Sequence, residues 1–248
     1  PYGVSVAVER LAEPQTAPPV FVAVGRFVEK KAPQKTLQAF AAMRGKVPEA
    51  RLVMVGDGPL LSDCRKWVAQ QGLEDAVGFT GVLSRRAVSR LLSTGRAFVQ
   101  HSVAAEDGDR EGLPLAILEA GAHGLPVVAT RHAGIPDAVR EGKDGILVDE
   151  GDIKGMAVAM WKLAAQPELA GKMGSSFRQR VTAHYSRKVS IERLQRILRC
   201  AAEGRPVREA LSPEEKPVET TKPAPAAESA IAAKLAEGRE ALKNGETA

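Results

Sequence analysis

The stretch Glu111-Gly-Leu-Pro-Leu-Ala-Ile-Leu-Glu-Ala-Gly-Ala-His-Gly-Leu-Pro-Val-Val-Ala-Thr130 decides the fold of this chain. It predicts a loop, a helix, a tight turn and a buried strand, in that order. Gly112 and Pro114 open the helix, since proline is tolerated in a first turn where its missing N–H would have no partner anyway. Gly124 suits a left-handed C-cap, and the apolar run at 126–129 suits a parallel strand buried on both faces.

Two carboxylates stand in this stretch, Glu111 at the mouth of the helix and Glu119 with seven residues between them. Leu115, Leu118 and Ala122 are expected to share the buried face of the helix. A helix N-terminus favours anions because its free N–H groups and its dipole point outward. A carboxylate at that position is therefore expected to have a structural or functional role. Taken alone, the spacing favours a simple interpretation in which Glu111 caps the helix and Glu119 is solvated.

Short apolar runs alternate with helical patterns on both sides of this stretch. The alternation predicts an α/β domain, Rossmann-like, with a doubly wound, six-stranded parallel sheet. The expected strands are residues 20–24, 51–55, 77–80, 97–100, 127–129 and 145–148. The expected helices are residues 33–43, 60–70, 85–92 behind an N-cap at Ser84, 115–123, 135–140, 153–165, 168–184 and 186–203. Such sheets bind ligands at the carboxyl ends of their strands, where the candidate loops lie.

The composition changes near both ends of the chain. Residues 1–19 are rich in Pro and Ala and lack a clear period, which predicts an interdomain linker. Residues 20–204 are the predicted α/β domain. Residues 205–248 are rich in Pro, Glu, Lys, Ala and Thr, and we expect a largely disordered tail with one candidate helix at 229–244.

Composition narrows the classes of function. A hydrophobic content of 44% supports a substantial core, and no run of about 18 apolar residues or signal peptide is present. Cys64 and Cys200 are isolated thiols without metal-binding spacing, which fits a reducing cytoplasm. The net charge of +5 suits anionic partners, including peripheral contact with the inner face of an anionic membrane. Aromatic residues make up only 4% and no basic cluster is interleaved with them, which argues against nucleic acid.

The central stretch resembles the signature of the family 4 retaining glycosyltransferases of GT-B fold, E-G-x-P-x-x-x-x-E-A-x-A-x-G-x-P-V-V-A. The resemblance implies the C-terminal, donor-binding half of such an enzyme. It would bind a nucleoside-diphosphate sugar as donor substrate, without a metal or other cofactor, and transfer the sugar with retention. Glu111 would lie beside the transferred sugar as the catalytic residue, and Glu119 would hydrogen-bond the ribose. The remaining donor contacts in this stretch would be Gly112, Leu113, Pro114 and Leu115.

A second motif supports the resemblance. Gly25 and Arg26 close the first strand and Lys31 follows five residues later, as in the G-R-x-x-x-x-K loop whose Arg and Lys clamp the diphosphate in that family. A nucleoside-diphosphate leaving group gains charge as the glycosidic bond breaks, and fixed cations with a helix N-terminus stabilise that charge. The family often has Gly after the Lys where this chain has Ala32, a change from which we expect little consequence.

Two further segments are similar to family motifs. Phe79-Thr-Gly-Val-Leu83 resembles an F-x-G-x-v segment and would bring Val82 and Leu83 near the nucleobase, although an ordinary strand end explains it nearly as well. His132-Ala-Gly-Ile-Pro-Asp137 matches the G-G-x-x-E region, with Ala133 in place of the first Gly. We expect that loop to border the sugar pocket.

Three other features of the sequence give weaker indications of function. Gly56-Asp-Gly-Pro59 lacks the Lys-Ser/Thr of a phosphate loop, so a tight turn explains it better. Asp107-Gly-Asp109 mimics the D-x-D metal motif of the other glycosyltransferase fold, but three residues in a polar loop match by chance often. The histidines show no triad-like arrangement that sequence can support.

The first residues, Pro1-Tyr-Gly-Val-Ser5, are similar to the segment that crosses between the two domains in family 4 enzymes, with Tyr and Ser where Asn and Asp are usual. The similarity implies an N-terminal acceptor domain upstream of this chain. Two alternatives stay open. One is a nucleotide-sugar epimerase of the same fold, and the other is a non-catalytic nucleotide-sugar-binding module of a larger assembly.

Overall fold

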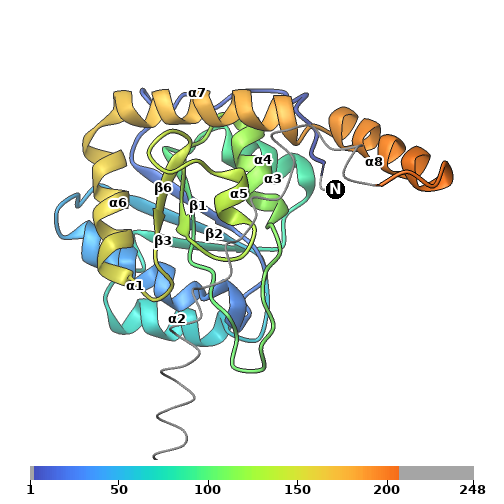
Figure 1. The fold of residues 1–248 in the computed structure, drawn as a ribbon. Helices are drawn as coiled ribbons and strands as arrows, with labels where there is room; N and C mark the ends of the chain where they lie inside the picture. Colours follow the sequence, from blue (N-terminus) through green and yellow to red (C-terminus); the bar gives the residue numbers. More distant parts are fainter. Residues whose placement is uncertain (1–2, 207–248) are drawn as a thin grey trace, which may run out of the picture. The chain divides into compact units, whose positions relative to one another are not determined.

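The computed structural model describes residues 3–206 of the chain, drawn in colour in Figure 1. The described residues divide into two units after Leu194, and each is considered by itself. The first unit contains all the strands and the site described below. The candidate helix at 229–244 lies outside the described residues.

The first unit is built on one parallel sheet, as predicted. Its strands are β1 (Val20–Val24), β2 (Arg51–Val55), β3 (Val77–Gly81), β4 (Ala97–Gln100), β5 (Val127–Thr130) and β6 (Gly145–Val148). Their order across the sheet is β3-β2-β1-β4-β5-β6, with every neighbouring pair parallel. The order reverses between β1 and β4, and ligands of doubly wound sheets bind outside the carboxyl ends at that point.

Eight α-helices and one short 3₁₀ helix are found in residues 3–206. They are η1 (Glu29–Lys31), α1 (Pro33–Arg44), α2 (Leu61–Gln70), α3 (Arg85–Leu92), α4 (Leu115–His123), α5 (Ile135–Ala138), α6 (Ile153–Ala165), α7 (Pro167–His184) and α8 (Arg187–Ala202). Ser84 caps α3 as predicted, accepting a hydrogen bond from the Ala87 amide at 3.3 Å. The predicted extension of α5 to residue 140 is wrong, because Val139 is extended and the Arg140 amide donates to the Asp144 carboxylate at 3.0 Å.

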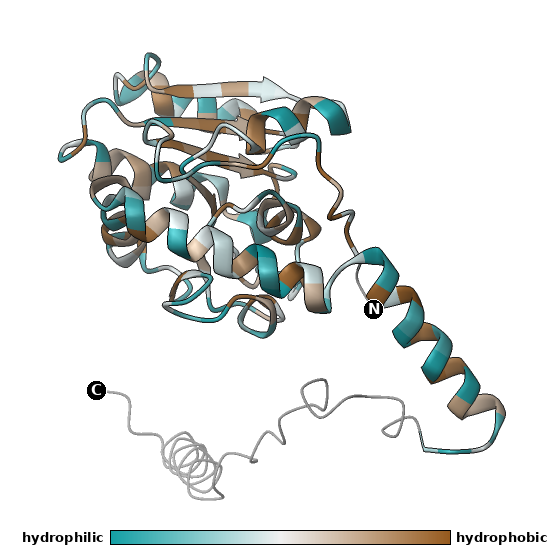
Figure 2. Ribbon diagram, turned by 90° about the horizontal axis from the view of Figure 1, so that it is seen from above, coloured by the Kyte–Doolittle hydropathy of each residue, from teal (hydrophilic) through white to brown (hydrophobic). Residues whose placement is uncertain are grey.

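Helices cover both faces of the sheet, because successive side chains of a strand point to opposite faces. Phe21 points to the face covered by α1, α2 and α6, and Val22 to the face covered by α3, α4, α5 and α7. Both side chains are fully buried. In Figure 2 the strands are mostly apolar, whereas the helices carry both apolar and polar residues. One hydrophobic core therefore lies on each face of the sheet. The polar ends of the strands lie outside both cores and are available for a binding site.

The central stretch folds nearly as predicted. Gly124 adopts φ 81°, and its N–H bonds back to the last turn of α4, so it is the expected left-handed C-cap. Leu118 and Ala122 are fully buried. The expectation that Leu115 shares the buried face is wrong: its side chain is 47% exposed, and Ile117 is buried instead. The first turn of α4 faces a cavity, and Leu115 lines that cavity.

The segment that starts the described chain lies against the same unit. Val4 is buried, its N–H donates to the Tyr185 carbonyl at 2.9 Å, and its carbonyl accepts from the Arg187 amide at 2.9 Å. An isolated parallel bridge thus joins Val4 to Ser186. That residues 1–19 link two domains stays a prediction.

The turn after β2 supports the loop after β1. Gly56 and Gly58 have φ values of 132° and 154°, which favour glycine. A Cβ at Gly56 would lie 2.0 Å from the Gly25 carbonyl oxygen, and one at Gly58 would lie 2.6 Å from that of Phe27. The Gly-Asp-Gly-Pro motif is thus a tight turn packed under the Gly25-Arg26 loop, as the sequence suggested.

Candidate functional site

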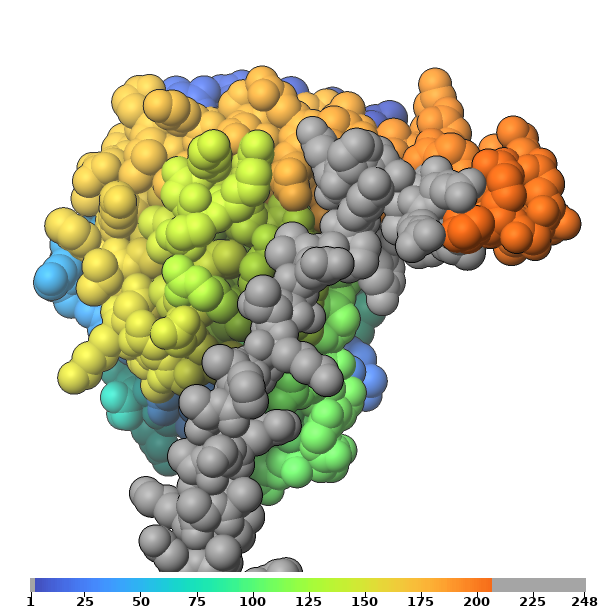
Figure 3. Space-filling view, viewed as in Figure 1, coloured from blue at the N-terminus to red at the C-terminus, as the bar shows by residue number. Residues whose placement is uncertain are grey.

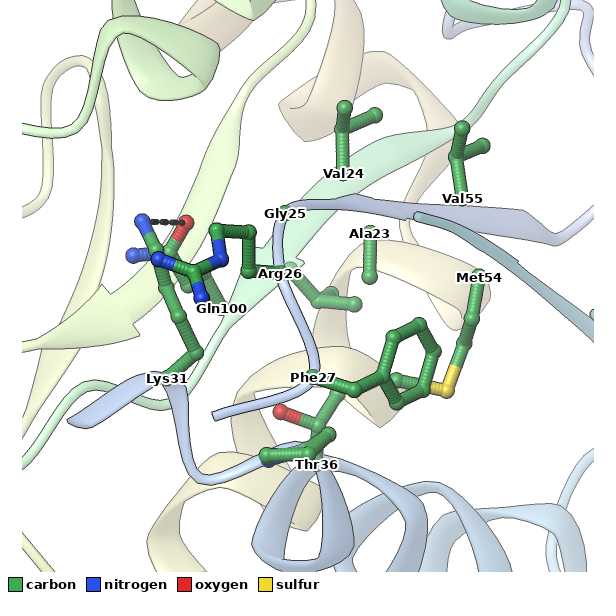
Figure 4. A pocket seen from close by; sticks show the side chains of 12 residues that line it. Ala23, Val24, Gly25, Arg26, Phe27, Lys31, Thr36, Met54, Val55 and Gln100 are labelled. Carbon is green, nitrogen blue, oxygen red and sulfur yellow. Dashed lines mark hydrogen bonds between the residues drawn. The ribbon is translucent and has the colours of Figure 1, made fainter. Parts of the chain in front are cut away.

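A small cavity of about 30 Å³ lies at the carboxyl ends of β1, β2 and β4. Gly25 and Arg26, directly after β1, and Lys31, at the end of η1, line it. Figure 4 shows the Arg26 and Lys31 side chains extending to the same side, toward Gln100. The Lys31 ammonium donates to Gln100 Oε1 at 3.5 Å. The predicted Gly-Arg…Lys loop therefore places two cations beside the point where the strand order reverses.

Glu111 joins this group. Its carboxylate lies 3.2 Å from Lys31 Nζ and 3.8 Å from Lys30 Nζ. The Glu111 and Lys31 side chains are only 12% and 15% exposed, so this pair is partly shielded from water. Burial lowers the pKa of Lys31, and the Glu111 charge opposes that effect. The sequence thus predicted the members of this pair, while the contribution of Lys30 went unrecognised.

The loop between Glu111 and α4 presents backbone donors. The Gly112 carbonyl accepts from the Gly134 amide at 2.9 Å, and Pro114 is the N-cap residue of α4. The amides of Gly112 and Leu113 have no hydrogen-bond partner within residues 3–206. Together with the unbonded N–H groups of the first helical turn, they make this end of α4 suited to an anion.

A larger cavity of about 280 Å³ adjoins the small one, and Val24 lines both. The predicted residues Leu83, Leu115 and Glu119 line it, whereas Val82 is 78% exposed and does not. Burial raises the pKa of Glu119, opposed by the charge of Arg85. Within residues 3–206 the Glu119 carboxylate has no hydrogen bond or ion pair, so a ligand hydroxyl there would meet an unengaged acceptor.

His123 and Ser89 form part of the wall of this cavity. His123 Nδ1 lies 2.8 Å from the Glu119 carbonyl, so it carries the proton, and Nε2 accepts from the Ser89 hydroxyl at 2.8 Å. Burial lowers the pKa of His123. This neutral ring ties α3 to α4, which gives both side chains a structural role.

Residues 101–110 form an insertion between β4 and α4, the bright green lobe of Figure 3. Asp109 pairs with Lys30 at 2.9 Å, and the Asp107 carboxylate accepts from the Asp109 amide at 2.8 Å. The Val103 amide donates to the Lys30 carbonyl at 3.0 Å. Asp109 thus holds the insertion against η1, while the Asp107 contact lies within the insertion. Within residues 3–206 no three His, Cys, Asp or Glu side chains gather as a metal site.

The structure therefore brings the predicted site residues into two adjoining groups: Gly25, Arg26 and Lys31 with Glu111, and Leu83 and Leu115 with Glu119. Gly112, Leu113 and Pro114 lie at the mouth of α4. Sequence reasoning missed Lys30, Gln100 and Glu150, and left the contacts of His132 undefined. A signal for two of them was available, since Gln100 ends β4 and Glu150 follows β6, where polar residues of such sheets face ligands.

Known proteins are similar to this chain in sequence and fold. The family model described as "Glycosyl transferases group 1" matches residues 9–180. The chain is 31% identical over 188 residues to the "GDP-mannose-dependent alpha-(1-6)-phosphatidylinositol monomannoside mannosyltransferase" of Mycolicibacterium smegmatis, covering 75% of this chain and 49% of that protein. It is 34% identical over 139 residues to the "Putative colanic acid biosynthesis glycosyltransferase WcaL" of Salmonella typhimurium, covering 56% and 34%.

Solved structures show the same fold. The C-terminal domain of a glycosyl transferase group 1 family protein (LpcC) from Francisella tularensis superposes with a TM-score of 0.64 at 22% identity, over 75% of this chain and 100% of that one. Anabaena Alr3699/HepE in complex with UDP-glucose gives 0.67 at 20% identity, over 81% and 56%. The chain spans about half or less of the curated relatives it matches. Because the family model covers more than half of the 248 residues, the chain belongs to the glycosyl transferases group 1 family.

Proposed function

We propose that this chain is the donor-binding domain of a retaining glycosyltransferase that uses a nucleoside-diphosphate sugar and works without a metal. One observation carries the proposal: Lys31 pairs with Glu111 at 3.2 Å and lines the same cavity as Arg26, and the cavity that Glu119 lines shares Val24 with it. A diphosphate fits between the cations and the helix, and a nucleoside fits the cavity. The positive charge of Arg26 and Lys31 suits the negative charge of the diphosphate in such a donor.

The chemistry follows from charge. As the bond between sugar and diphosphate breaks, the leaving group becomes more negative. Arg26, Lys31 and the amides of Gly112 and Leu113 are donors that stabilise this charge. Removing one such donor from an enzyme typically slows turnover by about 10²–10³.

Glu111 has a separate part in the proposal. In the free protein its carboxylate is engaged with Lys31 at 3.2 Å. A bound diphosphate competes for Lys31, which turns the ion pair into a contact between Lys31 and phosphate and leaves Glu111 to the sugar. There it orients the sugar and supports the positive charge of the oxocarbenium-like stage. Glu119, on the cavity wall, accepts from the ribose hydroxyls.

Relatives bear on the donor and the acceptor. One is named a GDP-mannose-dependent enzyme, and one similar structure contains UDP-glucose, so both bases belong in any test. Since the chain spans half or less of these relatives, we propose that an N-terminal domain supplies the acceptor site. The epimerase and the non-catalytic module are less well supported, because the relatives named here are transferases.

We propose a cytoplasmic location, which the isolated thiols Cys64 and Cys200 support. The net charge of +5 supports contact with the inner face of an anionic membrane. No helix within residues 3–206 is both long and apolar enough to cross a lipid bilayer.

Calorimetry tests the binding mode. UDP and GDP are titrated into the chain with and without EDTA, and one of them should bind equally well in both buffers. Arg26→Ala and Lys31→Ala should each weaken that binding by about 1.5–3 kcal/mol, the usual loss for hydrogen bonds to charged groups. Lys162→Ala, an exposed lysine in the last turn of α6, is the matched control and should change nothing. Binding that fails in EDTA but survives both site substitutions would contradict the proposal.

A further inference from the structure

His132 lies in the loop after β5 and holds the loop that carries Glu111. The Glu111 amide donates to His132 Nε2 at 3.1 Å, so this nitrogen bears a lone pair. The ring proton is then on Nδ1, which lies 2.6 Å from Glu150 Oε1. Both ring nitrogens are thus used, and the tautomer is set by the two neighbours.

Glu150 extends this chain of contacts. Its second oxygen accepts from the Ala104 amide at 3.0 Å. Partial burial acts to raise the pKa of Glu150, but the hydrogen bonds from His132 and Ala104, together with nearby positive charge, outweigh it and lower that pKa. An ionised carboxylate therefore accepts both bonds, and such bonds are about twice as strong as neutral ones. One side chain after β6 joins the loops that follow β4 and β5.

His132 acts on the site only through Glu111. The ring is 1% exposed and lines neither of the two cavities. Its bond goes to the backbone that precedes Gly112 and Leu113. A second link, from the Gly134 amide to the Gly112 carbonyl at 2.9 Å, fixes the same loop one residue further on. The loop is thus held at its backbone, which leaves the Glu111 carboxylate free for other contacts.

We propose that His132 and Glu150 are positioning residues that set the Glu111 carboxylate and the amides of Gly112 and Leu113 before the donor binds. The inference rests on the proposed function for the identity of the ligand, a nucleoside diphosphate. Its geometric part, the tautomer and the bond to Glu111, can be tested without any ligand.

The tautomer is the first test. Nitrogen NMR of the chain labelled at histidine should show His132 with a protonated Nδ1 and a bare Nε2 at neutral pH. The His132 signals are identified as those that disappear in His132→Asn. A proton on Nε2, in either a neutral or a doubly protonated ring, would overturn the proposal.

Two matched substitutions form the second test. In His132→Asn the side-chain amide can replace Nδ1 and keep Glu150, but nothing reaches the Glu111 amide. In His132→Gln the longer side chain can reach as far as Nε2 and accept from that amide. One hydrogen bond has a net worth of about 0.5–1.5 kcal/mol, so Asn should weaken calorimetric binding of UDP or GDP by about three- to tenfold and Gln by about twofold at most. Equal losses in the two variants would indicate a merely structural ring.

Controls separate the possible failures. Asp149→Asn removes a neighbouring carboxylate that is 84% exposed and pairs with Arg131, and it should bind as the wild type does. If His132→Asn does not fold, Glu150→Gln takes its place. The single side-chain oxygen of glutamine cannot accept from both His132 and Ala104, so this variant should bind the nucleotide about threefold more weakly. Unchanged binding in the folded variant overturns the inference. If the wild type binds neither UDP nor GDP, the proposed function fails. The NMR measurement of the His132 tautomer then tests the positioning role without a ligand.

Discussion

Ala32 and Ala133 adopt φ values of 36° and 45°, the positive-φ residues other than glycine within residues 3–206. Both stand where the motifs that the sequence resembles often have glycine, one directly after Lys31 and the other directly after His132. A side chain with a Cβ in left-handed backbone costs roughly 1–2 kcal/mol. The sequence pattern gave no reason to expect a consequence at Ala32, whereas the backbone shows strain at two loops of the site.

We expect Ala32→Gly and Ala133→Gly each to raise the free energy of unfolding by about 0.5–1 kcal/mol, since relief of the strain exceeds the added entropy of the unfolded chain. Urea denaturation measures the change. Ala42→Gly, at an exposed position inside α1, is the opposite control and should lower the free energy of unfolding by about 1 kcal/mol. A loss at Ala32 as large as the loss at Ala42 would show that the positive φ carries no strain.

His101 makes stability depend on pH. The ring is fully buried, its Nε2 accepts from the Gly151 amide at 2.9 Å, and its Nδ1 has no partner within residues 3–206. Burial, helped by the Lys35 charge, lowers the pKa of His101 from 6.5 to about 4. Between these two values the unfolded chain binds a proton that the folded chain does not, so the folded state loses stability as the pH falls from 6.5 to about 4.

The loss should reach up to about 3 kcal/mol at the acid end of this window and vanish above its upper limit. Urea denaturation of the wild type and of His101→Gln, repeated across this pH window, gives the free energy of unfolding as a function of pH for each protein. The difference between the slopes of these two curves measures the loss due to His101. Parallel slopes would mean that the His101 pKa is not lowered.

The two glutamates of the site should separate by role. Glu111→Gln removes the charge that engages Lys31 at 3.2 Å, so bare UDP or GDP should bind as tightly as before or more tightly. Glu119→Ala removes the acceptor on the cavity wall and should weaken binding by about 1–3 kcal/mol. Calorimetry with both variants measures these affinities. Equal weakening of nucleotide binding in both variants would contradict the separate roles of the two glutamates.

At the scale of elements, local pattern predicted most of the fold. Every predicted strand is present, and its bounds agree within one residue, because apolar runs and turn residues are properties of a few neighbours in the chain. The Arg26, Lys31 and Glu111 group could also be predicted, since each member belongs to a short motif. The bond from His132 to Glu111 and the contacts of Glu150 could not, because they join loops 18 to 46 residues apart. Local spacing carries no information on such contacts.

The insertion at 101–110 gives a prediction at this scale. Asp109 is 55% exposed, so its pair with Lys30 adds little stability, and Asp109→Asn should change the free energy of unfolding by less than about 1 kcal/mol. The loop itself should loosen, because this pair and the Val103 amide hold it on η1. Hydrogen exchange should be faster at Val103 in Asp109→Asn and unchanged in β4. Unchanged exchange at Val103 would show that the ion pair does not hold the insertion.

For the whole molecule, we expect this chain to bind donor and transfer nothing by itself. Much of the rate acceleration in a two-substrate enzyme comes from holding both reactants in register, and the proposed acceptor site belongs to another domain. Product assays with UDP- and GDP-sugars should stay at background while calorimetry shows nucleotide binding. Robust transfer by the purified 248-residue chain would mean that the acceptor site lies within it.

The bridge between Val4 and the start of α8 has a mechanical consequence. Two hydrogen bonds of 2.9 Å hold Val4 against Tyr185 and Arg187, and the two segments run parallel. A force that pulls residue 3 and residue 187 in opposite directions would therefore load both hydrogen bonds in shear. Gly3, Val4, Ser5, Ala7 and Val8 also line the 280 Å³ cavity. Each strand of the sheet is held by more residue pairs than this single bridge. Stretching the chain would therefore strip that lining and open the cavity to solvent while all six strands stay paired.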